Sequence, residues 1–109
     1  MSQIIKEHLK EQVAALPHSP GIYQYLDRNN KIIYVGKAKD LKKRVSSYFV
    51  ESREHSAKVI VMVRQIVDIR HIVVDTEQDA LLLENSLIKS LQPRYNILLK
   101  DDKTYPWIV

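Results

Sequence analysis

Two short segments rich in aromatic and β-branched residues constrain the fold of this chain more than any other feature. "GIYQYL" occupies residues 21–26 and "KIIYVG" occupies residues 31–36, with the polar residues "DRNN" between them. Such segments favour β-strands, and a short polar linker containing asparagine, which tolerates positive φ, favours a tight turn. The sequence therefore predicts an antiparallel hairpin. With a symmetric turn, Tyr23 lies opposite Tyr34 and both hydroxyls emerge on one face.

Helical patterns flank the hairpin on both sides. Residues 4–16 carry an apolar stripe at helical spacing, and the prolines that follow them stop this helix. Residues suited to N-terminal caps predict three further helices, which begin after Asp40, Ser56 and Thr76. Pro93 is expected to end the last of them.

The remaining segments complete a small α+β domain. Residues 68–75 are rich in β-branched side chains and predict a third strand, and residues 95–109 are predicted to be extended, with a turn around Asp101 and Asp102. We therefore expect residues 1–109 to form one domain, in which a mostly antiparallel three-stranded central sheet is flanked by helices. A composition of 45% hydrophobic and 28% charged residues fits a compact fold and excludes a disordered chain.

Composition also limits where the chain works. It has no cysteines, so disulfides and thiolate–zinc sites are excluded, which is consistent with a cytoplasmic location. No signal peptide is evident, and the apolar runs are far shorter than the roughly 20 residues that a transmembrane helix needs. The net charge of +4 and the pI near 9.3 favour an anionic partner such as nucleic acid.

A cluster of cations follows the second predicted strand. Its members are Lys37, Lys39, Lys42, Lys43 and Arg44. On a helical wheel, Arg44 lies one turn from Tyr48, and both border the apolar stripe of their helix. A half-sheltered guanidinium is suited either to a structural ion pair or to a phosphate, which it can bind through two donors. Lys42 and Lys43 point elsewhere on the wheel, as solvated charges do.

The predicted helix after Thr76 carries a carboxylate on its apolar face. Ala80, Leu87 and Ile88 form one arc, and Glu84 projects into the middle of it. A buried carboxylate must be paired, protonated or bound to a cation. The residues alone therefore leave two alternatives: a buried ion pair, or a ligand for a hard divalent cation whose shell is completed by water and phosphate oxygens.

Three of the six tyrosines, Tyr23, Tyr34 and Tyr48, lie near the cationic cluster in this reading. Packing explains any one of them, because aromatic residues are common in strands and cores. Three converging hydroxyls would instead indicate proton transfer. A phenol has a pKa near 10, so it acts as a base only where nearby positive charge, such as that of Lys37, lowers this pKa.

The tripeptides "GIY" at 21–23 and "YVG" at 34–36 resemble the defining pair of the GIY-YIG nuclease superfamily. The match continues through "LPHSPGIY", "GKAKDLKKRVSSYF" and "LLLENSLIKSLQPRYNILLKDDKTYPWI", so it covers nearly the whole chain. Within the superfamily, the chain resembles the N-terminal nuclease domain of the UvrC family, which acts in bacterial nucleotide excision repair. Relatives often have a glycine in the linker that is "DRNN" here. Asn29 or Asn30 can adopt the same left-handed geometry.

The resemblance implies roles for seven residues. Tyr34 would be the general base, or a relay, that activates water for attack on a phosphodiester. Arg44 would stabilise the charge that develops on the phosphate, and Glu84 would hold one divalent cation, Mg²⁺ or Mn²⁺. Tyr23, Lys37 and Tyr48 would complete the hydrogen-bonded pocket, and Asn96 would support its floor. The residues in contact with DNA would be Lys37, Lys39, Lys42, Lys43 and Arg44.

The resemblance also implies a substrate and partners. The domain would cut damaged duplex DNA on the 3′ side of a lesion, with little sequence preference because no groove-reading element is evident. Its partners would be UvrB and the repair complex that UvrA loads, and it would not bind a membrane. The isolated domain is expected to be a monomer. Because UvrC-like proteins are much longer, we expect this sequence to be an excised N-terminal fragment.

Two other functions remain open at this point. A non-catalytic nucleic-acid-binding module would keep the basic surface but would not need Tyr34, Arg44 and Glu84 together. All three are present, which favours the enzyme. A homing or restriction nuclease of the same superfamily would carry its own specificity elements, for which this chain has almost no room.

Overall fold

A three-stranded sheet and five helices make up the part of the chain that the computed structural model describes, residues 3–49 and 56–103. In chain order the elements are α1 (Gln3–Ala14), β1 (Gly21–Leu26), β2 (Ile32–Ala38), α2 (Leu41–Phe49), α3 (Ala57–Gln65), β3 (Asp68–Val73), α4 (Glu77–Leu91) and α5 (Arg94–Lys103). The strand order is β2–β1–β3 with both pairs antiparallel, which confirms the predicted α+β class and sheet. Within the described ranges, no helix has the length and apolar character needed to cross a membrane.

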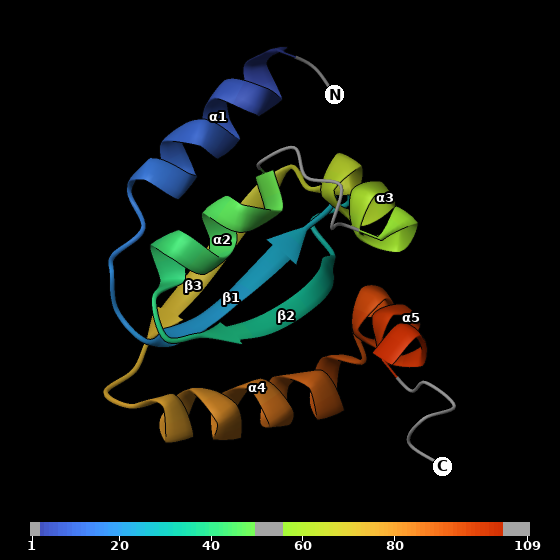
Figure 1. The fold of residues 1–109 in the computed structure, drawn as a ribbon. Coiled ribbons are helices and arrows are strands. Elements are labelled where there is room, and N and C mark those ends of the chain that lie inside the picture. Colours follow the sequence, from blue (N-terminus) through green and yellow to red (C-terminus); the bar gives the residue numbers. More distant parts are fainter. Residues whose placement is uncertain (1–2, 50–55, 104–109) are drawn as a thin grey trace.

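Helices cover the sheet on both sides (Figure 1). α2 lies across the face to which the tyrosines of β1 point, and its Leu41 and Val45 are fully buried there. Buried side chains from α1, α3 and α5 complete this core: Leu9, Met62, Tyr95 and Leu99. α4 packs against β2 and β1 on the opposite side, where Ile22 and Val35 alternate with the tyrosines and are also fully buried. The hairpin therefore lies between α2 and α4.

The register of the hairpin differs from the predicted one by two residues. Tyr34 pairs with Tyr25, not with Tyr23. The difference arises because the turn is longer than "DRNN": Leu26 pairs with Ile32, and a bulge between Tyr25 and Leu26 then adds one more residue on β2. A shift by two residues keeps every side chain on its side of the sheet. The predicted face of the tyrosines is therefore right, although their pairing is wrong.

Local hydrogen bonds hold the turn between β1 and β2. One carboxylate oxygen of Asp27 accepts from the backbone N–H of Asn29 at 2.9 Å and of Lys31 at 3.1 Å. Asn30 has a φ of 60°, in the left-handed region. The expectation that an asparagine replaces glycine in this turn is confirmed.

The predicted helix caps are present. The side chains of Asp40, Ser56 and Thr76 each accept a hydrogen bond from the backbone N–H three residues later, at 3.0, 3.3 and 3.1 Å. At the other end of α4, Gln92 adopts a left-handed conformation directly before Pro93, as expected for a helix that stops there.

The prediction of an extended segment after Pro93 is wrong. Residues 94–103 form α5, and the helix runs through the residues that were expected to turn. Pro93 initiates this helix, because its carbonyl accepts from the N–H groups of Asn96 and Ile97. Tyr95 and Leu99 are four residues apart and both buried, so one face of α5 packs on the core. The last residues of the predicted extended segment, 104–109, lie outside the described ranges.

Candidate active site

Four tyrosines converge on the face of the sheet beneath α2. Tyr23 and Tyr25 come from β1, Tyr34 from β2 and Tyr48 from α2. The ring centroids of Tyr23 and Tyr34 are 6.2 Å apart, and the ring of Tyr48 lies 5.8 Å from that of Tyr23. The hydroxyls of Tyr23 and Tyr48 form a hydrogen bond of 3.1 Å. The structure thus brings together the three tyrosines singled out in the sequence.

Gly36 makes room for this cluster. A Cβ atom at Gly36 would overlap the phenol ring and the hydroxyl of Tyr23, which is its cross-strand partner. No described glycine has a positive φ, so the need here is space, not unusual backbone geometry. The glycine of "YVG" is therefore required by the tyrosine of "GIY", which explains in physical terms why the two tripeptides occur together.

Arg44 extends the cluster toward solvent. Its guanidinium carbon lies 5.8 Å from the centroid of the Tyr48 ring, as the spacing of one helical turn predicted. The charge of ionised Tyr23 raises the pKa of Arg44, and a hydrogen bond to Tyr23 adds to this effect. Arg44 is exposed over much of its length, so its donors can reach a ligand from outside.

Tyr34 is buried, and burial raises its pKa well above the ordinary value for a phenol. The neighbouring Tyr48 raises the pKa further, through its charge when ionised and through a hydrogen bond, and Glu84 does so through its negative charge. The positive charge of Arg44 acts against these effects and lowers the pKa of Tyr34. Tyr34 is therefore protonated at neutral pH.

Glu84 lies on α4 and is half-buried. α4 packs on the opposite side of β2 from α2, and the negative charge of Glu84 raises the pKa of Tyr34 from there. Within the described ranges, no group of three or more His, Cys, Asp or Glu side chains could hold a metal ion. A single carboxylate fits Mg²⁺ or Mn²⁺ when water and phosphate oxygens supply the other ligands, because Mg²⁺ usually keeps several waters.

Asn96 on α5 forms hydrogen bonds with the backbone of the strand that carries Tyr34. Its amide accepts a hydrogen bond from the backbone N–H of Val35 and donates one to the carbonyl of Val35, both at 2.8 Å. Val35 lies between Tyr34 and Gly36 on β2, which is an edge strand. Asn96 therefore occupies the free edge of the strand that carries Tyr34, and it does not join the tyrosine cluster itself.

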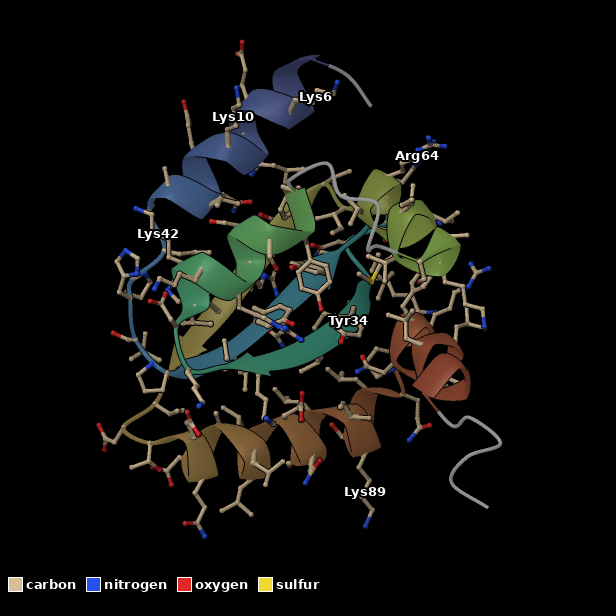
Figure 2. The ribbon with its side chains drawn as sticks, in the orientation of Figure 1. Lys6, Lys10, Tyr34, Lys42, Arg64 and Lys89 are labelled. Atoms are coloured by element: carbon tan, nitrogen blue, oxygen red, sulfur yellow. The ribbon has the colours of Figure 1, made fainter. Side chains whose placement is uncertain are left out.

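A basic hollow of about 490 Å³ opens beside the cluster. Its lining residues are Lys37, Ala38, Lys39, Asp40, Lys43, Arg44 and Ser47. Four of the five predicted DNA-contacting cations line it, and Lys42 does not. In Figure 2, Lys42 points outward from the start of α2, at a distance from Tyr34. Lys39 also lies 3.5 Å from Glu77 at the start of α4, where both side chains are exposed.

Sequence reasoning missed Tyr25. Its side chain is fully buried, and its ring lies 5.2 Å from that of Tyr23 and 6.0 Å from that of Tyr34. A signal was available, because residues two apart on a strand share a face and Tyr23 had already been placed on it.

The chain has close relatives among proteins of known class. A family model described as a UvrC-like GIY-YIG domain matches residues 19–97. UvrABC system protein C of Flavobacterium psychrophilum is 67% identical over 100 residues, which is 92% of this chain and 16% of the relative. The same protein of Bacteroides thetaiotaomicron is 65% identical over 103 residues, 94% of this chain and 17% of the relative.

A solved structure has the same fold. The crystal structure of the GIY-YIG N-terminal endonuclease domain of UvrC from Thermotoga maritima, bound to magnesium as its catalytic divalent cation, matches with a TM-score of 0.72. The two chains are 32% identical, and the match covers 87% of this chain and 98% of that one. The fold, the tyrosine cluster and these matches show that the chain belongs to the UvrC-like GIY-YIG domain family. It spans about a sixth of the length of the curated relatives.

Proposed function

We propose that this domain is a divalent-metal-dependent DNA endonuclease, which hydrolyses a phosphodiester on the 3′ side of a lesion during nucleotide excision repair. The observation that carries the proposal is electrostatic: Tyr34 on β2 is acted on by both Arg44 on α2 and Glu84 on α4. These effects support the proposal that a phenol, a guanidinium and a carboxylate from three separate elements act in one site. This combination suits phosphodiester hydrolysis, which needs a proton acceptor, a cationic group and a metal ligand.

The raised pKa of Tyr34 favours a relay over a simple base. A protonated phenol can take a proton from water only while it passes its own proton on. The attacking water gives its proton to Tyr34 while the proton of Tyr34 passes along its hydrogen bond to Tyr48, and Tyr48, which is only partly buried, releases its own proton to solvent. The bond between Tyr48 and Tyr23 holds the Tyr48 hydroxyl in place. Arg44 closes the cluster on the solvent side and stabilises the negative charge that grows on the phosphate.

Glu84 is the residue that holds the divalent cation. When bound, Mg²⁺ or Mn²⁺ polarises a phosphate oxygen and offsets its charge. The position of Glu84 is set by α4. The Thr76 cap and the contacts with the sheet fix this helix beside β2. Asn96 keeps the strand of Tyr34 in place through its two bonds to Val35.

The basic hollow binds the DNA backbone next to the scissile phosphate. Lys37, Lys39 and Lys43 line it together with Arg44, so a few phosphates can be neutralised at once. Such contacts carry no sequence information, so binding should be weak, salt-dependent and nearly independent of sequence. In the longer protein, UvrB and the complex loaded by UvrA would recognise the lesion and provide the affinity for DNA. We propose that the domain acts on DNA in the bacterial cytoplasm, as the N-terminal part of that longer protein.

The metal assignment can be tested with two charge-neutralising variants on the same helix. Glu84→Gln should abolish Mn²⁺ binding in calorimetry and cation-dependent nicking of a lesion-containing duplex, with an unchanged circular dichroism spectrum. Glu77→Gln, also on α4 but paired with Lys39 at the surface, should change neither. Unchanged Mn²⁺ binding in Glu84→Gln would contradict the assignment. Cation-independent DNA binding without any nicking by the wild type, in the presence of UvrA and UvrB, would favour the non-catalytic module.

A further inference from the structure

Tyr25 is the centre of the aromatic cluster. Its ring lies 5.2 Å from Tyr23, 6.0 Å from Tyr34 and 5.4 Å from Tyr48. Phe49 is a fourth aromatic neighbour of Tyr25, with ring centroids 6.1 Å apart in a T-shaped arrangement. No other ring in the described ranges contacts all three tyrosines of the proposed catalytic cluster and Phe49. The orientation of these phenols therefore depends on a residue that has been given no role so far.

The contact with Tyr34 is set by the sheet. Tyr25 and Tyr34 are direct cross-strand partners, and their rings are stacked with an interplanar angle of 24°. The longer turn and the bulge between Tyr25 and Leu26 together produce this pairing, because a symmetric turn without a bulge would have placed Tyr23 opposite Tyr34. Stacked aromatic pairs of this kind stabilise the fold by more than the burial of their surface area alone. The ring of Tyr25 therefore restrains that of Tyr34.

The hydroxyl of Tyr25 makes no such contribution. It is fully buried and has no hydrogen-bond partner among the described residues. Burial and the neighbouring tyrosines raise its pKa, so it stays protonated and cannot act as a base. An unpaired buried hydroxyl is unfavourable for folding. The ring and the hydroxyl of Tyr25 thus have opposite effects, which makes them separable by mutation.

We propose that Tyr25 is a positioning residue of the nuclease site, whose ring holds Tyr34 and Tyr48 in their reactive arrangement and whose hydroxyl is dispensable. The inference rests on the proposed function. Tyr25 does not reach the DNA, because the whole residue is inaccessible to solvent. Its effect on the reaction passes through the two phenols that it contacts.

Three variants separate the ring from the hydroxyl. Tyr25→Phe keeps all four ring contacts and removes only the oxygen. Tyr25→Leu removes the ring contacts, and Tyr25→Met does the same with a longer, flexible side chain of similar volume that can adapt to the space, in case the leucine variant does not fold. Phe49→Leu is the matched control, since it removes an aromatic contact of Tyr25 on a side chain that belongs to α2 but not to the proposed proton relay.

The readouts are DNA affinity, the single-turnover cleavage rate at saturating DNA, and the NMR signals of ¹³C-labelled tyrosine rings. For Tyr25→Leu or Tyr25→Met we expect unchanged Kd, a cleavage rate lower by about tenfold to a hundredfold, and shifted ring signals of Tyr34 and Tyr48. Tyr25→Phe should keep the rate and those signals, and it should unfold at a higher temperature. Phe49→Leu should lower the unfolding temperature without changing the cleavage rate at a temperature where it is folded.

Two results would overturn the inference. If Tyr25→Phe loses as much rate as Tyr25→Leu, the hydroxyl takes part and the ring is not the active element. If Tyr25→Leu and Tyr25→Met keep the wild-type rate, the ring has no positioning role. A wild type that nicks no DNA under any condition would instead count against the proposed nuclease function, and the ring signals of Tyr34 would still report whether Tyr25 orients it.

Discussion

The side-chain amide of Asn96 pairs with both backbone polar groups of Val35, at 2.8 Å each, and so takes the place of a neighbouring strand on the free edge of β2. The opposite edge of the sheet has the same arrangement. The amide of Gln12 on α1 accepts from the N–H of Ile69 at 3.0 Å and donates to its carbonyl at 3.2 Å. Both edge strands are thus fixed at one residue by an amide from a helix, which also protects them from pairing with another chain.

Asn96→Ala should destabilise the domain and impair cleavage. Removing the amide leaves two backbone groups of Val35 without partners, which should lower the free energy of unfolding by about 2 kcal/mol. Chemical denaturation measures this loss. Gln12→Ala is the control, because it removes an amide that is bonded to Ile69 on β3, the edge strand opposite β2. The N–H of Ile69 keeps its hydrogen bond to Asp68, so we expect a smaller loss of stability in Gln12→Ala, with full cleavage. Equal cleavage by the two variants would show that the edge of β2 does not position Tyr34.

Gly36→Ala should disrupt the tyrosine cluster. The added methyl group would overlap the phenol of Tyr23, so the ring must move and its hydrogen bond to Tyr48 must break or lengthen. Overpacking of this kind typically lowers the free energy of unfolding by about 1–3 kcal/mol. Thermal unfolding and a cleavage assay on the same preparation measure both effects.

Gly21→Ala provides the comparison for Gly36→Ala. A methyl group there would overlap the carbonyl of Ile72 and contact Leu41, but it would not meet a tyrosine of the site. Both variants should be destabilised, and only Gly36→Ala should lose cleavage at a temperature where it is folded. If Gly36→Ala cleaves as fast as Gly21→Ala, the close approach of Tyr23 to Gly36 has no bearing on catalysis.

Arg44→Lys should impair cleavage although it keeps the charge. Lysine cannot offer two parallel donors to a phosphate, and its ammonium lies differently over the Tyr48 ring. We expect the single-turnover rate to fall by about 10²–10³-fold, as for the loss of one electrostatic donor in other enzymes, with a small change in Kd. Arg64→Lys on α3, which points to solvent in Figure 2, should leave the rate unchanged. A wild-type rate in Arg44→Lys would reduce its role to that of a simple positive charge.

Short-range features of this fold were predictable from the sequence. The caps at Asp40, Ser56 and Thr76 depend on hydrogen bonds to a residue three positions away, so a local pattern is sufficient to find them. The pairing of Arg44 with Tyr48 is likewise a matter of helical spacing. These predictions needed no knowledge of what packs against the helices.

Features that depend on distant parts of the chain were not predictable in the same way. The longer turn and the bulge at Tyr25 together move the partner of Tyr34 by two residues, and no local signal distinguishes them from a symmetric turn. α5 was missed because a proline can end one helix and begin the next, and the burial of Tyr95 on the core decides between a helix and an extended segment. The electrostatic effect of Glu84 on Tyr34 links α4 to β2. In the sequence, the only indication of it was the position of Glu84 on an apolar arc.

The stability of the domain at alkaline pH depends on its buried phenols. Burial raises the pKa of Tyr23 and of Tyr25 above the value of about 10 that a phenol has in the unfolded chain. A raised pKa in the folded state means that the unfolded state releases the proton first. The stability linked to each group is therefore fully present below about pH 10 and is lost as the pH rises toward the pKa of the folded state.

Each buried tyrosine should thus steepen the fall of the free energy of unfolding above about pH 10, by about 1.4 kcal/mol per pH unit. Tyr25→Phe removes one such group without removing its ring contacts, so its stability should fall less steeply than that of the wild type, and the two curves should diverge only in this alkaline range. Urea unfolding at a series of pH values from neutral to alkaline measures both curves. Parallel curves would mean that Tyr25 ionises as readily in the folded domain as in the unfolded chain, which its complete burial and lack of a hydrogen-bond partner within the described ranges argue against.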